Sequence, residues 1–366
     1  MTPLGDAVPL GQVRRALVIT LRHHGDVLLA SPVISVLKNH APALEIDALA
    51  YVDTAPMLAL HPALAQLHTV DRGWKDLGSI ARLGREWALY RRLAARRYDL
   101  LIHLTESWRG AWLARALRAR WAVAPERKGA GRHWRASFSH LAPRAAGRHT
   151  VESNLDALRR IGVQPAVDER RLVLEPGDAA RAAVATLLGA HGLQAQRFVQ
   201  IHATSRWRFK CWTAAGWAEI VRRLQAAGWP VVLTAAPDPD ELAMTTAVQQ
   251  RLERPALDLS GRLGLKELAA LAGEARLFIG VDSAPMHIAA AMRTPAVALF
   301  GPSGADLWGP WGTPRRGGHR VVASTRHSCR PCGLDGCGGG KVSDCLETLD
   351  ADSVWRAVSA ELESPA

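Results

Sequence analysis

The sequence predicts an α/β protein made of two doubly wound domains, each a parallel sheet covered by helices on both faces. Short apolar, β-branched runs alternate with helically spaced apolar segments, and this alternation occurs twice along the chain. A chain of 366 residues with 48% hydrophobic residues also buries more core than one compact domain normally holds. We place the domains at residues 1–170 and 171–366, with a linker near 163–176.

The first domain opens with a strand over residues 15–21, a loop that contains Gly25 and Asp26, and a helix over 27–40. The alternation then continues with a strand over 44–51, a basic amphipathic helix over 77–97, a strand over 100–104 and a helix over 108–120. A polar stretch rich in Gly and Arg, over 126–149, interrupts the pattern before a helix over 151–161.

The second domain repeats the alternation after the linker. Its expected helices cover residues 178–191, 214–227, 240–252, 265–272 and 284–292, and its expected strands cover 198–202, 231–234, 277–280 and 296–300. A last helix, over 351–362, could pack on either domain. The ligand is expected in the cleft between the domains, at the carboxyl ends of the strands.

The positive charge is concentrated in the first half of the chain. Residues 1–168 hold 24 Lys and Arg against 14 Asp and Glu, whereas residues 169–366 hold 22 against 20. Within residues 91–160 there are 16 basic and 5 acidic residues, a density typical of a surface that binds a polyanion. Nucleic acid, an acidic membrane surface and a phosphorylated substrate all fit this excess. Coding bias with a solvated face is the plain alternative, but it explains Arg in place of Lys rather than the excess over acids.

The composition excludes several classes of protein. Gly and Pro are scattered along the chain, which excludes a collagen-like or largely disordered protein. Residues 1–15 contain no apolar stretch before the first basic residues, and no uncharged apolar run approaches the length of a membrane span. We therefore expect a globular protein that is neither secreted through a cleaved signal nor membrane-spanning.

The loop after the first strand carries a candidate catalytic acid. Gly25 allows a tight backbone approach, and Asp26 stands where the strand leads into a helix. A carboxylate at that place serves either as a helix N-cap or as a general base. Taken alone, the cap is the more frequent role of an Asp that opens a helix.

Two loops of the second domain carry groups suited to a diphosphate. The strand over 198–202 is followed by the hydroxyls of Thr204 and Ser205 and then by the cation of Lys210. Hydroxyl and amide donors together with a point charge suit a phosphate, and a solvated polar loop is the plain alternative.

In the other loop, Ser283 is a suitable N-cap and Pro285 falls in the first helical turn, so that the helix start forms an anion site. Asp282 would repel a phosphate there unless it faces another group, such as sugar hydroxyls. His287 lies about one turn inside the helix, where a core histidine is the equal alternative.

Taken in order along nearly the whole chain, these motifs resemble the ADP-heptose:lipopolysaccharide heptosyltransferases of glycosyltransferase family 9. The resemblance rests on Leu21-Arg-x-x-Gly-Asp26-Val-Leu, Lys210-Cys-Trp212 and Gly280-Val-Asp282-Ser-x-Pro-Met-His287-Ile-Ala-Ala-Ala. Three further segments and the final cysteine segment resemble the heptosyltransferase III branch: Arg22-His-His-Gly-Asp-Val-Leu-Leu, Asp53-Thr-Ala-Pro-Met-Leu and His103-Leu-Thr-Glu-Ser-Trp-Arg-Gly110.

The resemblance implies a GT-B fold, in which two doubly wound, Rossmann-like domains face each other across a cleft. The N-terminal domain would bind the acceptor and the C-terminal domain the ADP-sugar. The implied reaction is an inverting, metal-independent transfer of heptose from ADP-L-glycero-D-manno-heptose to the inner core of lipopolysaccharide, without a cofactor. By matching position, Asp26 would be the general base and Lys210 the cation on the diphosphate.

The resemblance also assigns donor-binding residues. Asp282 would contact the heptose, and Leu263 would pack on the adenine. The remaining implied donor contacts are Thr204, Ser205, Ser283, Ala284 and His287.

The basic first domain is then expected to bind an anionic acceptor at a membrane surface. The expected partner is the lipid A-anchored inner-core oligosaccharide, and the protein would be cytoplasmic and peripheral at the inner face of the inner membrane. The candidate acceptor residues are Arg22, Arg109, Arg127, Arg132 and Arg135. The alternatives are another core position, another nucleotide sugar or, from a different class, a non-catalytic nucleic-acid binder that uses the many arginines and the 13 tryptophans. We expect no nucleic-acid partner.

Asp238-Pro-Asp240 imitates the Asp-x-Asp metal signature of another glycosyltransferase fold. We interpret it as a helix start, because acids are favourable at a helix N-terminus, and we infer no divalent metal from it. The family's ribose-reading carboxylate stays open among Asp238, Asp240 and Glu241.

The clustered cysteines could bind a metal ion or remain free thiols. Cys211 lies in the predicted phosphate loop, whereas Cys329, Cys332, Cys337 and Cys345 cluster among glycines. Four soft ligands suggest structural zinc, but the second pair is spaced more widely than in common zinc ribbons. Disulfides would need an oxidising compartment that nothing in the sequence supports. Zinc and uncoordinated or redox-active thiols both stay open, with the thiols favoured.

Overall fold

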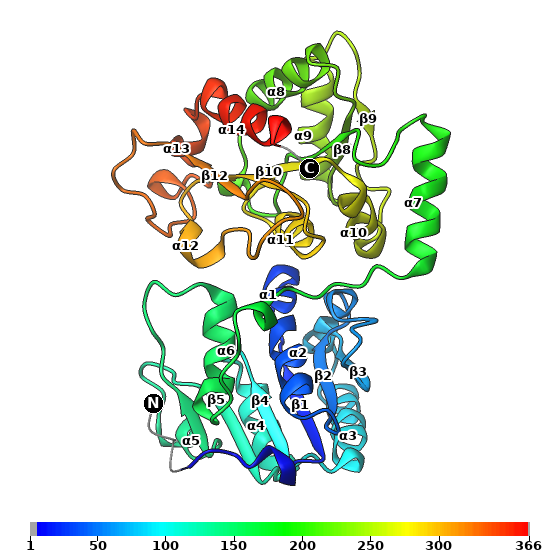
Figure 1. Ribbon diagram of the computed structural model, residues 1–366. Coiled ribbons are helices and arrows are strands. Elements are labelled where there is room, and N and C mark those ends of the chain that lie inside the picture. The colour runs from blue at the N-terminus through cyan, green and yellow to red at the C-terminus, as the bar shows by residue number, and fades with distance from the viewer. Residues whose placement is uncertain (1–5, 365–366) are drawn as a thin grey trace. The chain divides into compact units, whose positions relative to one another are not determined.

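The computed structural model describes residues 6–364, which form two compact α/β units (Figure 1). The units divide after Glu175, whereas the sequence analysis placed the boundary after residue 170. Each unit holds a parallel six-stranded sheet, so the predicted class of two doubly wound domains is confirmed. Among the described residues, no helix combines the length and the apolar character needed to cross a membrane.

The sheet of the first unit has the strand order β3-β2-β1-β4-β5-β6. Its strands are β1 (Arg15–Ile19), β2 (Glu45–Tyr51), β3 (Gln66–Val70), β4 (Leu100–His103), β5 (Trp121–Pro125) and β6 (His140–Ala142). The sequence analysis missed β3, β5 and β6. β3 and β6 lie at the edges of the sheet, and β6 lies inside the polar stretch over 126–149. β5 is an apolar run of five residues and was missed despite this local signal.

The helices of the first unit are α1 (His24–Leu29), α2 (Ser31–His40), α3 (Ser79–Arg96), α4 (Trp108–Leu117), α5 (Arg132–Arg135) and α6 (Thr150–Arg160). The single helix expected over 27–40 is wrong, because the segment breaks at Ala30. Pro32 has no N–H to donate to the Leu28 carbonyl. Val33 N–H donates to the Ala30 carbonyl at 3.1 Å, and the Leu29 carbonyl accepts from Asn154 Nδ2 at 3.1 Å. The break leaves α1 as a short helix directly after β1.

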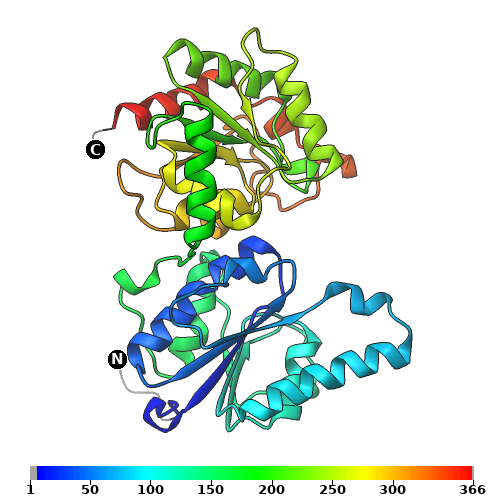
Figure 2. The same cartoon turned by 90° about the vertical axis from the view of Figure 1, so that its right-hand side faces the viewer.

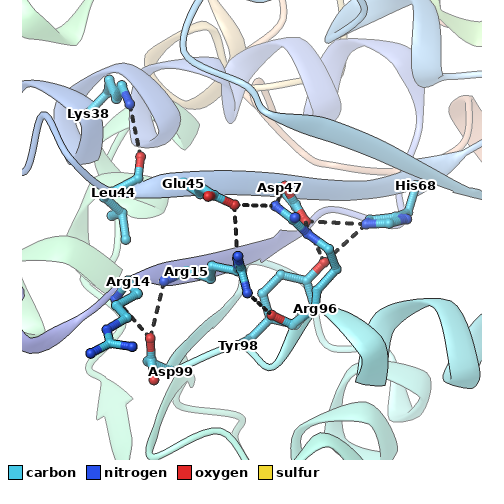
Figure 3. A network of polar contacts seen from close by, with 10 residues as sticks. All are labelled: Arg14, Arg15, Lys38, Leu44, Glu45, Asp47, His68, Arg96, Tyr98 and Asp99. Atoms are coloured by element: carbon cyan, nitrogen blue, oxygen red, sulfur yellow. Dashed lines mark hydrogen bonds and ion pairs between the residues drawn. The ribbon is translucent and has the colours of Figure 1, made fainter.

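A buried ionic network joins α3 to the sheet at the start of β2 (Figure 3). Asp47 is fully buried, and one of its carboxylate oxygens accepts from Arg96 Nε at 2.7 Å and from the Tyr98 hydroxyl at 2.7 Å. His68 Nε2 lies 3.4 Å from the same oxygen. Burial by itself would raise the pKa of Asp47, but the hydrogen bonds from His68, Arg96 and Tyr98 lower it from 3.8 to about 2.

Replacing Asp47 by Ala should lower the free energy of unfolding by about 3 kcal/mol or more, because Arg96 and Tyr98 would lose their shared acceptor. Since the folded pKa of Asp47 lies below its unfolded value, the stabilisation is complete above about pH 4 and is lost as the pH falls towards 2. Urea unfolding of the wild type and the variant at a series of pH values measures both effects. Glu45→Ala is the matched control, since this half-exposed acid bonds the same Arg96 at 2.8 Å and should contribute much less than Asp47. Equal losses for the two variants would contradict the assignment.

The sheet of the second unit has the strand order β12-β11-β10-β7-β8-β9. Its strands are β7 (Val199–His202), β8 (Val231–Thr234), β9 (Leu257–Asp258), β10 (Leu277–Val281), β11 (Ala296–Phe300) and β12 (Arg320–Ala323). Its helices are α7 (Asp178–Ala190), α8 (Ala214–Ala226), α9 (Pro239–Gln249), α10 (Leu265–Glu274), α11 (Ala284–Ala291), α12 (Ala305–Trp308), α13 (Asp344–Glu347) and α14 (Ala351–Glu363). The last helix, α14, packs on α8 and on β10 to β12, so it belongs to the core of the second unit (Figure 1).

Both sheets reverse their strand order beside their first strand. The reversal lies between β1 and β4 in the first unit and between β7 and β10 in the second. In doubly wound sheets, ligands bind at the carboxyl ends of the strands that flank such a reversal. A ligand site is therefore expected at the loops after β1, β4, β7 and β10.

Candidate active site

Asp26 lies in the first turn of α1, directly after β1. The N-cap residue of this helix is His23, so Asp26 is the third helical residue and the N-cap interpretation is wrong. Its side chain is 18% exposed and lies 3.6 Å from Arg22 Nε. Asp26 is therefore a partly accessible carboxylate at the strand reversal of the first unit, next to a cation.

Arg72 ties the loop of Asp26 to the ends of β2 and β3, a role that sequence reasoning missed. Its Nη2 donates to the Arg22 carbonyl at 2.7 Å, and its Nε donates to the Asp53 carboxylate at 3.1 Å. Its guanidinium also lies 3.7 Å from the centre of the Tyr51 ring. These contacts fix the backbone on which Arg22 and Asp26 stand.

The predicted acceptor arginines have different surroundings. Arg109, on α4, pairs with Glu86 on α3 and thereby joins two helices. Arg127 lies 3.7 Å from Glu106 and within 5.5 Å of the Trp108 ring centre. Arg135 is 65% exposed beside Glu126, and Arg132 is exposed. Arg127, Arg132 and Arg135 thus lie on and before the short helix α5, whereas Arg22 stands with Asp26.

In the second unit, Lys210 and Asp282 form an ion pair across the strand reversal. Lys210 follows β7 and Asp282 follows β10, and the Nζ and Oδ2 atoms are 2.6 Å apart. The side chains are 22% and 6% exposed. The sequence analysis gave these residues separate ligands, whereas the structure also joins them to each other. Asp282 therefore faces a cation, which answers how a carboxylate is accommodated beside a predicted anion site.

The residues after Lys210 hold its loop against the core. Trp212 is buried, and its Nε1 donates to the Leu349 carbonyl at 3.2 Å. A Cβ on Gly216 would collide with the Trp212 ring, so this glycine lets α8 begin directly against it. Cys211 is also buried, and burial raises the pKa of its thiol. Cys211 and Trp212 therefore hold the loop against the core, and Lys210 lies at the strand reversal.

Thr204 belongs to a buried polar cluster at the ends of β7 and β8. Its hydroxyl donates to Glu241 Oε2 at 2.6 Å, and the backbone N–H of Ala236 donates to the same oxygen at 3.2 Å. His202 Nε2 lies 3.7 Å from this oxygen as well. Burial by itself would raise the pKa of Glu241, but His202 and Thr204 hold it below its ordinary value. Glu241 therefore stays ionised and orients the Thr204 hydroxyl.

The three acidic residues near the start of α9 differ in how deeply they are buried. Asp238 is exposed and caps the helix, accepting from the backbone N–H groups of Asp240 and Glu241, so the predicted helix start is confirmed. Asp240 is exposed in the first turn, and Glu241 alone of the three turns inward. Sequence reasoning could not separate them, because burial depends on how α9 sits against β8.

The start of α11 is left open at its first turn. Ser283 occupies the N-cap position, but its hydroxyl donates to the Val281 carbonyl at 3.4 Å and makes no side-chain cap. The first amides of a helix have no acceptor within the helix, so an anion can bind there. Ala284 opens this turn, and His287 is buried one turn on. Leu263 is half-buried before α10 and packs against a core cluster that includes Leu271.

The four clustered cysteines differ in exposure. Cys329, Cys332 and Cys337 are exposed and Cys345 is buried, and all four are free thiols. Within residues 6–364, no three His, Cys, Asp or Glu side chains are placed together as ligands for a metal ion. Burial raises the pKa of the Cys345 thiol, and the neighbouring thiols raise it further.

These exposures predict the reactivity of the thiols. In the native protein, an aromatic disulfide reagent should modify Cys329, Cys332 and Cys337 rapidly, because their sulfur atoms are exposed to the reagent. Cys211 and Cys345 should react only after unfolding, since burial raises the pKa of both thiols. Mass spectrometry of the modified peptides identifies the sites. Protection of all four clustered thiols until a chelator is added, with about one zinc per chain, would contradict this prediction.

Comparisons with known proteins agree with the motifs and the fold. The model of "Glycosyltransferase family 9 (heptosyltransferase)" matches residues 86–332. Lipopolysaccharide heptosyltransferase 3 of Escherichia coli is 39% identical over 295 residues, which cover 80% of this chain and 84% of that protein.

Solved structures show the same fold. A family 9 glycosyltransferase from Veillonella parvula superposes with a TM-score of 0.81 at 23% identity, covering 95% of this chain and 97% of the other. An E. coli heptosyltransferase solved with ADP superposes with a TM-score of 0.73 at 18% identity, covering 95% of this chain and 99% of the other. These structural likenesses support the predicted GT-B class.

Proposed function

The chain belongs to glycosyltransferase family 9, and from that premise we propose that it is an inverting transferase that moves heptose from ADP-L-glycero-D-manno-heptose to the inner core of lipopolysaccharide. The observation that carries this proposal is the 39% identity to heptosyltransferase 3 over 80% of the chain. We propose that the heptose it adds is a side branch of the core. The placement of Asp26 and Lys210 beside the two strand reversals supports the assignment.

In the proposed reaction, Asp26 acts as the general base. Its carboxylate accepts the proton of the acceptor hydroxyl while that oxygen forms a bond to the anomeric carbon of the heptose. The bond from the anomeric carbon to the β-phosphate oxygen breaks on the opposite side, so the anomeric configuration inverts and ADP leaves. Asp26 is partly exposed and does not cap α1, so its carboxylate is available for this proton transfer.

Charge that develops on the departing ADP is stabilised by Lys210 and by the open start of α11 at Ser283 and Ala284. Asp282 holds the Lys210 ammonium in place through the 2.6 Å ion pair and lies where the heptose would be bound. The Thr204 hydroxyl donates to Glu241, so we move its predicted phosphate contact to the Thr204 backbone, beside Ser205. In this proposal His287 lines the phosphate end and Leu263 packs on the adenine. Lys210 and the start of α11 supply the positive charge near the departing ADP, and the proposed mechanism uses no metal or cofactor.

The acceptor proposal assigns the basic first unit to the lipid A-anchored inner-core oligosaccharide. Phosphate groups on such an acceptor match the exposed arginines of α5, Arg132 and Arg135, with Arg127 beside them. Arg22 would meet the acceptor next to Asp26. We propose that the enzyme works in the cytoplasm, peripheral at the inner face of the inner membrane.

Mass spectrometry of core oligosaccharide from a strain lacking this protein tests the function. The proposal expects a core that lacks one side-branch heptose and is restored by the wild-type chain. A core truncated at its first or second heptose would instead assign another core position. An unchanged heptose content, with loss of a different sugar, would assign another nucleotide-sugar donor.

A further inference from the structure

The N-terminal half of α3 is an exposed helix that projects from the side of the first unit (Figure 2). Every residue from 79 to 85 is exposed, although three apolar side chains follow one another along this part of the helix. Ile80 is 89% exposed, Leu83 69% and Trp87 61%. Large apolar side chains with this exposure, gathered in one place, mark a surface that contacts something else.

The three side chains share one face of the helix. The spacing of 80, 83 and 87 places them within about 60° of one another at 100° per residue. Leu89 and Leu93, the buried residues of α3, lie on the other side of the helix and pack into the core of the first unit. The Trp87 ring lies 5.3 Å from the Tyr90 ring of the same helix, and within residues 6–364 the packing of α3 leaves the face of Ile80, Leu83 and Trp87 largely exposed.

The rest of the helix is firmly attached, so its position is defined. Arg96 near its C-terminus bonds the buried Asp47 at 2.7 Å, as Figure 3 shows, and Glu86 pairs with Arg109 on the neighbouring α4. The apolar face thus belongs to a helix held at its middle and its C-terminal end.

The helix that carries the apolar face is strongly basic, and Arg91 borders that face at 100° per residue. Arg82, Arg85, Arg91 and Arg92 are exposed on α3, and its one acid, Glu86, is already paired with Arg109. A basic helix with Trp, Leu and Ile on one side has the composition of an interfacial helix that binds anionic lipid. Two copies of this helix would repel each other, because each carries a net positive charge, and this disfavours self-association through the apolar face.

We propose that the face of Ile80, Leu83 and Trp87 inserts into the interfacial region of an anionic membrane, with Arg91 at the headgroups and the basic charge of α3 attracting the anionic surface. This inference rests on the proposed function for the presence of a membrane-anchored acceptor, but the face itself follows from exposure, spacing and charge. Insertion would hold the first unit at the surface that carries its acceptor. Trp87 suits this depth, because its ring is apolar and its indole N–H can bond the headgroup region.

Co-sedimentation of the full chain with vesicles of phosphatidylcholine and phosphatidylglycerol tests the proposal, with vesicles of phosphatidylcholine alone as the uncharged reference. The variant carries Ile80→Ser, Leu83→Ser and Trp87→Ser, and its apparent affinity for the anionic vesicles should fall roughly a hundredfold. The matched control carries Val167→Ser and Leu334→Ser, which remove apolar side chains that are 79% and 60% exposed elsewhere, and it should bind like the wild type. Thermal unfolding checks that both variants fold.

Undiminished vesicle binding of the triple variant, or an equal loss in the control, would overturn the proposal. The proposal would also be overturned if the wild type were a dimer and the triple variant a monomer with unchanged affinity for lipid. The apolar face would then join two copies of the chain. Turnover of ADP-heptose with a delipidated core acceptor separates this inference from the proposed function. The triple variant should keep that turnover, whereas a wild type that binds anionic vesicles but transfers no heptose would leave the membrane face standing and remove the function.

Discussion

Replacement of Asp26 by Asn should leave the fold intact and lower turnover by about a hundred- to ten-thousandfold, the usual range for loss of a general base. Asn has the same shape as Asp but cannot accept a proton from the acceptor hydroxyl. Because His23 rather than Asp26 is the N-cap residue of α1, stability should change by less than the ~1 kcal/mol typical of a lost cap. Steady-state kinetics with ADP-heptose and thermal unfolding of the same preparation measure the two effects.

Asp71→Asn provides a matched control for this substitution. Asp71 also follows a strand of the first unit, but its carboxylate accepts from the Gly73 backbone N–H at 2.8 Å as a helix cap. Because Asn caps a helix about as well as Asp, this variant should keep both its stability and its turnover, whereas Asp26→Asn should lose turnover. Near-native turnover of Asp26→Asn together with early melting would return Asp26 to a structural role.

Replacement of Lys210 by Ala should weaken ADP binding by about ten- to a hundredfold, the range for a lost hydrogen bond to a charged group, and slow turnover further. The ammonium neutralises the diphosphate in the bound state and meets more charge as ADP leaves. Its removal also leaves Asp282, which is 6% exposed, without its cation and close to the bound anion. Lys210→Ala combined with Asp282→Asn separates these causes, because it removes the carboxylate that would repel ADP. Calorimetric titration with ADP measures all three proteins.

Neutralising Arg127, Arg132 and Arg135 together is the counterpart in the first unit. These substitutions should raise the KM for the lipid acceptor and flatten its dependence on ionic strength, while ADP affinity stays unchanged. Acceptor kinetics at two ionic strengths, beside the ADP titration, test this. If the arginine variant lost ADP binding while Lys210→Ala kept it, the assignment of donor and acceptor binding to the two units would have to be reversed.

Much of the secondary structure could be predicted from local pattern, and the exceptions have physical reasons. Strands such as β10 and helices such as α8 were placed within a residue or two, because a buried strand or an amphipathic helix imposes its own period on the sequence. The strand β6 was missed because its three residues have no such run, whereas the break at Ala30 had a local signal in Pro32 that the sequence analysis overlooked. The roles of Arg72 and Glu241 could not be predicted either, since their partners come from separate segments.

The sequence by itself determined the two doubly wound units, the family, and which loops follow the carboxyl ends of the strands, because periodicity and short motifs are properties of consecutive residues. Only the tertiary structure decided which side chains meet. Lys210 and Asp282 are 72 residues apart in the chain, and their contact exists because β7 and β10 are neighbours in one sheet. Likewise, the apolar positions of α3 read as one amphipathic helix in the sequence. The packing of Leu89 and Leu93 into the core decides that Ile80, Leu83 and Trp87 face outward, since a helix can turn only one side to its own domain.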